Sequence, residues 1–311
     1  EFNVANYLTN SNGIGAQFGY PTSDITRLGF SLTYDKTDID IGSLPAREIY
    51  DFVATEGNLF ETISAQASWQ RVTLNRGLFP TSGSSTVFSL STTIPGSDLN
   101  YYRANIRQKY YRPLSSNFVF GFQGELGYLD AYGDTKETPF FQNFYAGGPR
   151  SLRGFESNTL GPRSTDAPCY EFNYDEGTCP NLIDTDGDGE LDTPYINPYA
   201  NSTSRYRDRP IGGNIKIEGS LQLIFKLPFI EDQRSLRSAF FLDFGNVFSD
   251  NCKEYQINCY KPAVEDLRYS YGVGVTWITG FGPLSLAIAK PTNAGPQERT
   301  EEFQFTVGNV F

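Results

Sequence analysis

The chain has 311 residues and carries 25 Lys and Arg against 36 Asp and Glu, so its formal net charge is −11. This acidic balance argues against a nucleic-acid-binding protein, which needs a basic surface. The absence of His excludes catalytic triads, zinc sites and general bases built on that residue. Aromatic residues reach 15% while hydrophobic residues total only 39%. Many rings in a chain of modest hydrophobicity favour a wall that is apolar on one face and wet on the other.

Apolar and polar residues alternate along nearly the whole chain, with the two-residue period that predicts β-strands. In the segment 117–129, Phe118 and Phe120 share one face, whereas Gln123 and Glu125 share the other. The pattern predicts about twelve strands, at residues 2–9, 13–21, 26–40, 59–73, 84–96, 99–113, 117–130, 213–227, 235–249, 267–279, 283–291 and 301–311. Most are near the length of about 9–11 residues with which a tilted strand crosses a bilayer. Arg47–Thr55 is a candidate for one short helical turn.

The connections between the predicted strands alternate in length. Short turns alternate with longer loops, which span residues 41–58, 131–212, 250–266 and 292–300. Short turns on one rim and long loops on the other are typical of outer-membrane barrels. A soluble β-sandwich also alternates, but its inner face is aliphatic and its outer face charged, unlike the faces of these strands. The sequence therefore predicts an all-β protein, a single antiparallel transmembrane β-barrel over residues 1–311. Its long loops would be extracellular, and its strands would cross a bacterial outer membrane many times.

The predicted loop 131–212 is longer than the roughly 15 residues beyond which a loop is usually functional or disordered. It contains a Gly147-Gly148 turn followed by Arg153-Gly154-Phe155. On its own, so short a motif is most often an ordinary surface turn. Its position after a strand of a candidate barrel makes a second interpretation possible, in which the motif folds back into the lumen.

The strand at Ala239–Phe248 supplies a candidate partner for this motif. Alternation leaves Asp243 pointing inward and places the apolar residues toward lipid, namely Phe240, Leu242, Phe244 and Phe248. A lone carboxylate in a partly desolvated lumen needs a partner, and an Arg can offer two parallel hydrogen bonds. We therefore expect the loop 131–212 to fold partly into the lumen and Arg153 to pair with Asp243.

An acidic segment in the same loop resembles the start of an EF-hand calcium loop. Oxygen ligands alternate from Asp184, with Gly189 at the sixth position, but Tyr195 stands where the twelfth-position Glu is required. The spacing is closer to that of the shorter calcium loops of extracellular modules. The alternative is a solvated acidic loop. We expect one structural Ca²⁺, held by the side chains of Asp184, Asp186, Asp188 and Asp192 and by the carbonyl of Glu190.

The four Cys residues all lie in predicted long loops, as two pairs that are close in sequence. Spacing favours the disulfides Cys169–Cys179 and Cys252–Cys259, although four Cys allow three connectivities. Each bond would close a short loop in an oxidising compartment. Free thiols or a four-Cys metal site are the alternatives, and the metal site would need both loops to converge.

Several motifs together resemble the β-barrel domain of the BamA family of outer-membrane protein assembly factors. These are the stretches 77–84, 94–98, 139–148, 152–162, 241–245, 282–284 and 303–305, which together run from the second predicted strand to the end. The resemblance implies that Arg153, followed by Gly154 and Phe155, contacts an inward Asp that matches Asp243. Where the family often has a lumenal Glu, this chain has Gln222. The family barrel has sixteen strands after a row of POTRA domains, so we expect those domains and about four strands to be absent from this chain.

The last predicted strand is expected to form one side of a weakly paired seam. Phe303, Phe305, Val307 and Phe311 would face lipid, whereas Gln304, Thr306 and Gly308 would face the lumen. Gly308 either permits a kink in this strand or is a small lumen-facing residue. The strand opposite would lie near residues 2–9, with few hydrogen bonds across the seam.

The resemblance implies an insertase that folds and inserts outer-membrane β-barrel proteins, since an incoming strand can add to a poorly paired edge. A passive porin is an alternative, with Arg103, Arg107 and Lys109 lining its lumen, and a related polypeptide secretion transporter is another. The sequence shows no nucleotide-binding loop, and we expect no enzymatic activity. The implied partners are unfolded outer-membrane protein substrates, membrane lipid and lipopolysaccharide, and accessory assembly lipoproteins.

Overall fold

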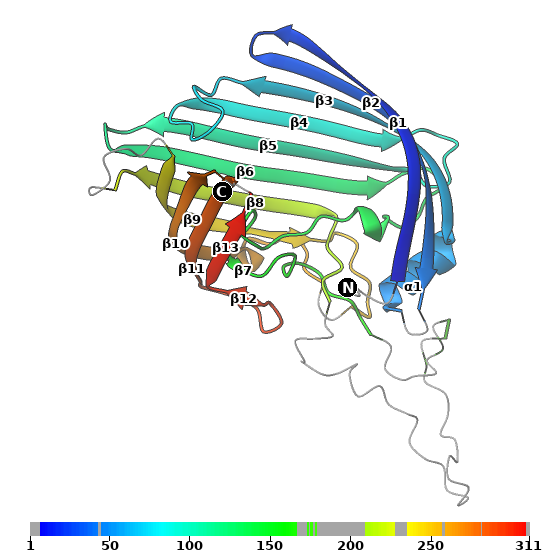
Figure 1. Cartoon of the computed structure of the whole chain (residues 1–311). Coiled ribbons are helices and arrows are strands. Elements are labelled where there is room, and N and C mark those ends of the chain that lie inside the picture. The colour runs from blue at the N-terminus through cyan, green and yellow to red at the C-terminus, as the bar shows by residue number, and fades with distance from the viewer. Residues whose placement is uncertain are drawn as a thin grey trace, which may run out of the picture.

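The computed structural model of the chain describes residues 7–42, 45–166, 173, 175–176, 178, 209–227, 235–256, 259–280 and 282–308. One antiparallel sheet dominates it (Figure 1). Its strands, in spatial order, are β1 (Tyr7–Ser23), β2 (Thr26–Ile41), β3 (Leu59–Val72), β4 (Gly83–Thr93), β5 (Tyr101–Pro113), β6 (Phe118–Ala131), β8 (Ile215–Phe225), β9 (Leu236–Phe248), β10 (Arg268–Thr279), β11 (Gly282–Pro291) and β13 (Phe303–Val307). Two short strands, β7 (Gly154–Phe155) and β12 (Thr300–Glu301), pair separately with each other.

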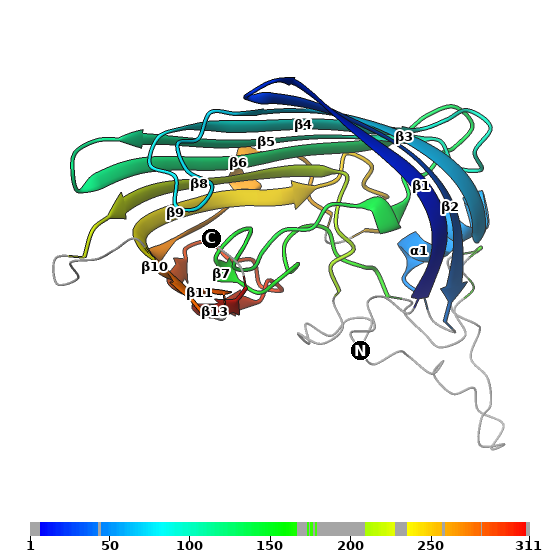
Figure 2. The same cartoon turned by 45° about the horizontal axis from the view of Figure 1, so that its top comes forward.

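The sheet curves strongly but does not close (Figures 1 and 2). Among the described strands, β1 and β13 are its two edges and do not pair with each other. Because neighbouring strands are antiparallel and the sheet has eleven of them, β1 and β13 run in the same direction. A direct pairing of the two edges would therefore be parallel, unlike every other pair in the sheet.

The sheet has eleven strands rather than about twelve because two predicted strands, 2–9 and 13–21, are parts of one. Residues Asn10 to Asn12, which separate the two predicted strands, continue β1 and pair in register with Lys36 to Asp38 of β2. The partner strand β2 is 16 residues long, so its ladder overrides the local turn preference. Residues Phe2 to Asn6 lie outside the described part of the chain.

The outer face of the sheet is apolar and the inner face polar, as the alternation predicts. On β13, Phe303 and Phe305 are 60% and 54% exposed, whereas Gln304 between them is 1% exposed. On β9, Phe240 and Leu242 are exposed and Asp243 is fully buried. The prediction that Phe248 faces lipid is wrong. Its side chain is only 1% exposed, at the loop end of β9, where the chain at Gly213 also packs on the Phe248 backbone.

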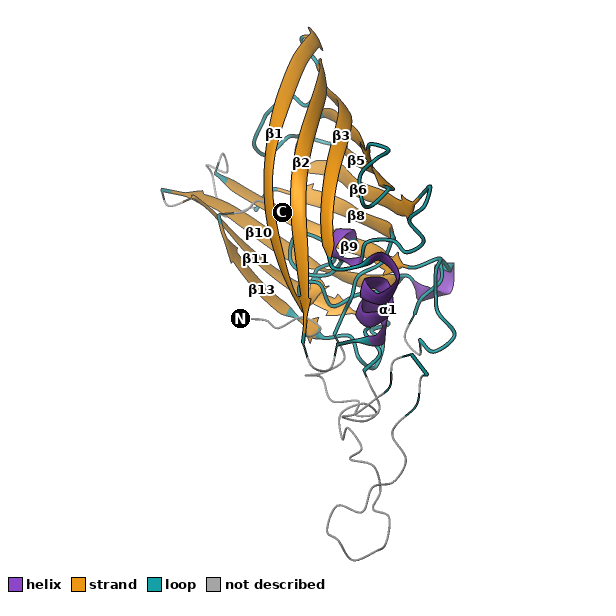
Figure 3. Cartoon of the chain, turned by 90° about the vertical axis from the view of Figure 1, so that its right-hand side faces the viewer, coloured by secondary structure: helices purple, strands orange, loops and turns teal. Residues whose placement is uncertain are grey.

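Helix α1 (Arg47–Glu56) is longer than the single turn that the sequence suggested. It lies at the loop end of the strands (Figure 3). Its buried residues Ile49 and Phe52 pack with Phe60 of β3 and Phe140 of the loop after β6, and the rings of Phe52 and Phe140 meet edge to face. The helix is therefore stabilised by tertiary contacts more than by its own sequence. In the part of the chain that the structure describes, no helix is long and apolar enough to span a membrane.

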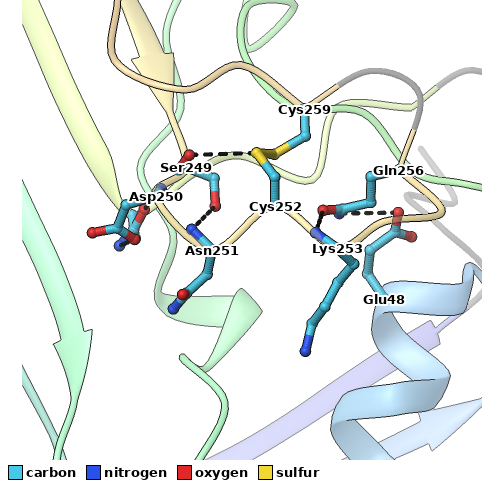
Figure 4. The surroundings of a disulfide bond; sticks show 9 residues. Glu48, Ser249, Asp250, Asn251, Cys252, Lys253, Gln256 and Cys259 are labelled. Atoms are coloured by element: carbon cyan, nitrogen blue, oxygen red, sulfur yellow. Dashed lines mark hydrogen bonds between the residues drawn. A yellow bond between two sulfur atoms is a disulfide. The ribbon is translucent and has the colours of Figure 1, made fainter.

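A disulfide joins Cys252 to Cys259 in the loop between β9 and β10. Within this loop Gln256 donates a 3.2 Å hydrogen bond to the Glu48 carboxylate of α1 (Figure 4). Tyr255 donates to Asp51 of the same helix at 2.5 Å. The disulfide loop thus fastens α1 over the loop end of the sheet. Cys169, Cys179 and the predicted calcium ligands between Asp184 and Asp192 lie outside the described residues.

Candidate functional site

The chain between β6 and β8 turns back into the concave side of the sheet and carries β7 there (Figure 2). A double-glycine turn makes this path possible. Gly147 and Gly148 have φ of +103° and +99°, values that favour glycine. A Cβ at Gly147 would lie 2.5 Å from the carbonyl oxygen of Glu156, so the returning chain also leaves no space for a side chain. The Gly147 N–H donates to Ser151 Oγ at 2.9 Å, which closes the turn before Arg153.

Arg153 lies inside the sheet and pairs with Asp243 of β9, as the sequence predicted. Its Nε donates to Oδ2 of Asp243 and its Nη2 donates to Oδ1, both at 2.7 Å. The Arg153 backbone N–H donates to the same carboxylate at 3.2 Å. The Arg153 side chain is 5% exposed and that of Asp243 is 0% exposed. This bidentate geometry satisfies both carboxylate oxygens, as a buried charge pair requires.

Two further residues contact the guanidinium. Its Nη2 also donates to Ser220 Oγ of β8 at 3.0 Å, and its plane stacks 3.5 Å from the centre of the Phe241 ring. Gln222, which stands where the family often has a lumenal Glu, lies on the same strand, β8. Gln222 donates to Ser220 Oγ at 3.3 Å, and Ser220 pairs in register with Asp243.

The residues after Arg153 anchor the loop by packing. Gly154 has φ +89°, and a Cβ there would lie 3.2 Å from Ala289 and 3.3 Å from Pro291, both of β11. Phe155 is fully buried, in a cluster with residues of the loop and of β6 and β9, namely Leu129, Phe144, Ala146, Leu152, Leu160 and Val247. The motif therefore combines a charge pair, a close backbone approach and an apolar anchor.

A cavity of about 830 Å³ separates the loop from the inner wall of β5, β6 and β8. Its charged residues are largely paired with one another. Glu125 accepts from Arg107 at 3.0 Å and from Asn105 at 2.9 Å, and Lys216 lies 2.9 Å from Glu218. Glu218 in turn accepts from Ser151 of the loop. The sequence predicted that Arg107 lines the lumen. It did not predict the ion pairs around the cavity, although Lys216, Glu218 and Ser220 share one face of the alternation in β8.

The seam residues differ in how far the structure describes them. Phe303 and Phe305 lie on the exposed outer face of β13. Gly308 follows β13 with φ +83°, and its N–H donates to the Pro283 carbonyl at 2.7 Å. This positive φ favours the kink over the alternative of a merely small residue. Phe311 lies outside the described residues.

Comparison with known proteins decides the family. The sequence matches the Omp85 superfamily domain over residues 1–311. The chain belongs to the Omp85 superfamily. It is 30% identical to the outer membrane protein assembly factor BamA of Neisseria meningitidis serogroup B, over 99% of this chain and 37% of that protein. It is also 27% identical to the mouse sorting and assembly machinery component 50 homolog, over 58% of this chain and 30% of that protein.

Solved structures place the fold in the same superfamily. A crystal structure of Haemophilus ducreyi BamA lacking POTRA domains 1–3 matches with a TM-score of 0.76 and 27% identity, over 98% of this chain and 55% of that chain. CdiB from Escherichia coli matches with a TM-score of 0.52 at 10% identity, over 96% of this chain and 44% of that chain, which shows a shared fold alone. The chain thus spans about a third to a half of the length of these relatives. As an Omp85 member, it is an outer-membrane β-barrel protein.

Proposed function

We propose that this chain acts in an assembly factor that inserts β-barrel proteins into the outer membrane, with β13 as the strand to which substrate strands add. The similarity to BamA over 99% of the chain supports the assembly function. The short pairing of β13 supports the place of action. β13 pairs with β11 over five residues, from Ile288↔Phe303 to Leu284↔Val307, whereas every other neighbouring pair of the sheet shares at least nine.

A weakly held edge suits strand addition for a physical reason. An edge strand presents unpaired N–H and C=O groups, and a second chain can satisfy them by forming a new ladder. In lipid the need is greater, because an unpaired backbone group there costs several kcal/mol. Gly308 follows the five-residue β13 with a positive φ and still donates to the Pro283 carbonyl of β11. The reaction would require no covalent chemistry and no nucleotide.

The polar inner wall and the docked loop argue against a passive pore. The loop motif fills part of the concave side, and several charges around the cavity form ion pairs, among them Arg107–Glu125 and Lys216–Glu218. The exposed aromatic face would contact membrane lipid. Lipopolysaccharide and accessory lipoproteins are further partners that the BamA family suggests.

The folding rate of a substrate tests this proposal. The intact protein is reconstituted in lipid vesicles, and a urea-unfolded outer-membrane β-barrel protein is added. We expect faster folding than in empty vesicles or in vesicles with the heat-inactivated protein. Equal folding rates in all three, together with large steady currents across a planar bilayer, would favour the porin interpretation instead.

A further inference from the structure

The inward loop touches the last strand of the sheet directly, through Gln304 of β13. The Gln304 side chain is 1% exposed and points inward. Its Nε2 donates to the Phe155 carbonyl at 2.7 Å, and its Oε1 accepts from the Gly154 N–H at 3.4 Å. A single amide therefore satisfies two backbone groups of the segment that follows Arg153.

A second contact joins the same two segments. β12 immediately precedes β13 and pairs antiparallel with β7, in the register Thr300↔Phe155 and Glu301↔Gly154. The ladder is extended by the Glu156 N–H, which donates to the Arg299 carbonyl at 3.0 Å, and by the Arg299 N–H, which donates to Thr159 Oγ1 at 3.0 Å. The loop motif thus binds the chain both within the last strand and just before it.

A buried ion pair fixes the other end of this connection. Arg268 at the start of β10 donates through Nε to both carboxylate oxygens of Glu298, at 2.7 Å each. Glu298 also accepts from the Gly295 N–H at 2.6 Å, and both charged residues are 7% exposed. The connection from β11 to β13 is therefore anchored at Glu298 and held by the loop from residue 299 onward.

We propose that the Arg153 loop and β13 move as one unit, with Gln304 as the positioning residue that links them. While Arg153 is bound to Asp243, Gln304 and the β7–β12 ladder hold β13 against β11. When the loop leaves Asp243, β13 loses the contacts of Gln304 and of the β7–β12 ladder. It keeps its five-residue ladder with β11 and the flanking hydrogen bonds from Ala289 N–H to the Glu302 carbonyl and from Gly308 N–H to the Pro283 carbonyl. The position of the loop thereby controls how readily the edge opens. Such control of the β13 edge would regulate the proposed insertase, and its biological meaning rests on that proposed function.

The neighbouring inward residue of β13 provides a matched control. Thr306 lies on the same face of the same strand, and its buried Oγ1 has no hydrogen-bond partner among the described residues. Replacing it by Val keeps its shape and removes no described hydrogen bond. A residue that only packs and a residue that couples can therefore be compared on one strand.

Amide hydrogen exchange of the intact protein in lipid bilayers is the test. In Gln304→Leu we expect exchange of residues 303–307 and 153–156 to rise by about tenfold, because a buried carbonyl loses its donor. Thr306→Val should leave both segments unchanged, and the paired strands β4 and β5 should be unchanged in both variants. In Arg153→Ala, residues 303–307 should exchange faster too, and adding Gln304→Leu should produce little further increase, as coupled residues show.

Three results would overturn the coupling. One is unchanged exchange of residues 303–307 in Gln304→Leu, another is an equal rise in Thr306→Val, and the third is fully additive effects of Arg153→Ala and Gln304→Leu. If Gln304→Leu fails to fold, Gln304→Met keeps the length of the side chain and removes both hydrogen bonds, and the same pattern is expected. The measurement needs no substrate, so coupling can fail while insertion activity persists, and insertion can fail while coupling holds.

Discussion

At the scale of single residues, the Arg153–Asp243 pair is the strongest polar contact between the loop and the wall. Arg153→Ala should destabilise the fold by about 3–5 kcal/mol, because it leaves the fully buried Asp243 without a counter-charge. The matched control is Arg107→Ala, which breaks a pair whose arginine side chain is 63% exposed and should cost only about 0–1 kcal/mol. Heat-dependent unfolding in detergent measures both. Equal stability of Arg153→Ala and the unchanged protein would show that the buried Arg153–Asp243 pair does not stabilise the fold.

Gly308 offers a second test at this scale. Gly308→Ala should cost about 1–2 kcal/mol, because an L-residue is strained at φ +83°. No atom lies within 4 Å of a Cβ at Gly308, so the cost would be conformational rather than steric. Gly77→Ala is the control, since its Cβ also meets nothing and its φ is not in the positive range. Similar unfolding temperatures for the two variants would show that the positive φ at Gly308 does not matter for the stability of the fold.

Some of these residues could be predicted from the sequence and others could not. Alternation alone turns Asp243 inward, and the motif around Arg153 then supplies its partner. The contact with Ser220 was missed because it depends on the register between β8 and β9, which alternation does not fix. The link through Gln304 needs the path of a long loop, and no local pattern encodes that path.

At the scale of elements, tertiary contacts lengthen both a strand and a helix beyond what the local sequence predicts. The Asn10 to Gly13 segment has the composition of a turn but continues β1, since β2 offers a long partner. Helix α1 shows little helical pattern, yet Ile49 and Phe52 bury against Phe60 and Phe140. Both outcomes depend on neighbours far along the chain, which explains why sequence reasoning misjudged them.

The contact of α1 with its neighbouring loops should depend on pH. Both Glu48 carboxylate oxygens accept from the Thr165 N–H, at 3.1 and 3.0 Å, but burial raises the pKa of Glu48 above its ordinary value. A raised pKa means that the folded state binds the proton more tightly than the unfolded state does. The contribution of Glu48 to the free energy of unfolding therefore falls as the pH rises from the ordinary Glu pKa through the raised one. Proteolysis of the loops around α1 should therefore increase from mildly acidic to neutral pH. In Glu48→Gln that pH dependence should be absent, and an unchanged pH profile would show that another group is responsible.

The calcium site and the Cys169–Cys179 disulfide stay predictions at this scale. Titration calorimetry of the protein in chelated buffer would test the site. We expect heat on addition of millimolar Ca²⁺, and a smaller response in Asp186→Ala. A full response in Asp186→Ala would leave only the solvated acidic loop.

At the scale of the whole molecule, the described strands form a curved wall whose two edges, β1 and β13, do not pair with each other. β1 presents a long edge of 17 residues and β13 a short one of five, and the two run in the same direction. A direct pairing of the two edges would therefore be parallel. That residues 2–9 lie opposite the last strand stays a prediction, because residues 2–6 lie outside the described part of the chain. The short edge is also the edge that the Arg153 loop contacts.

The central claim is that substrate strands add to β13, and site-specific cross-linking tests it most directly. Photo-reactive side chains are placed in the intact protein at Phe305, on the outer face of β13, and at Trp277, on the same face of β10, while a substrate β-barrel protein is stalled during insertion. Both positions are about half exposed, but β10 is paired on both sides. We expect the substrate to cross-link at Phe305 and not at Trp277. Cross-links that are equal at both positions, or that form only at lumenal positions such as Arg107, would contradict strand addition at this edge.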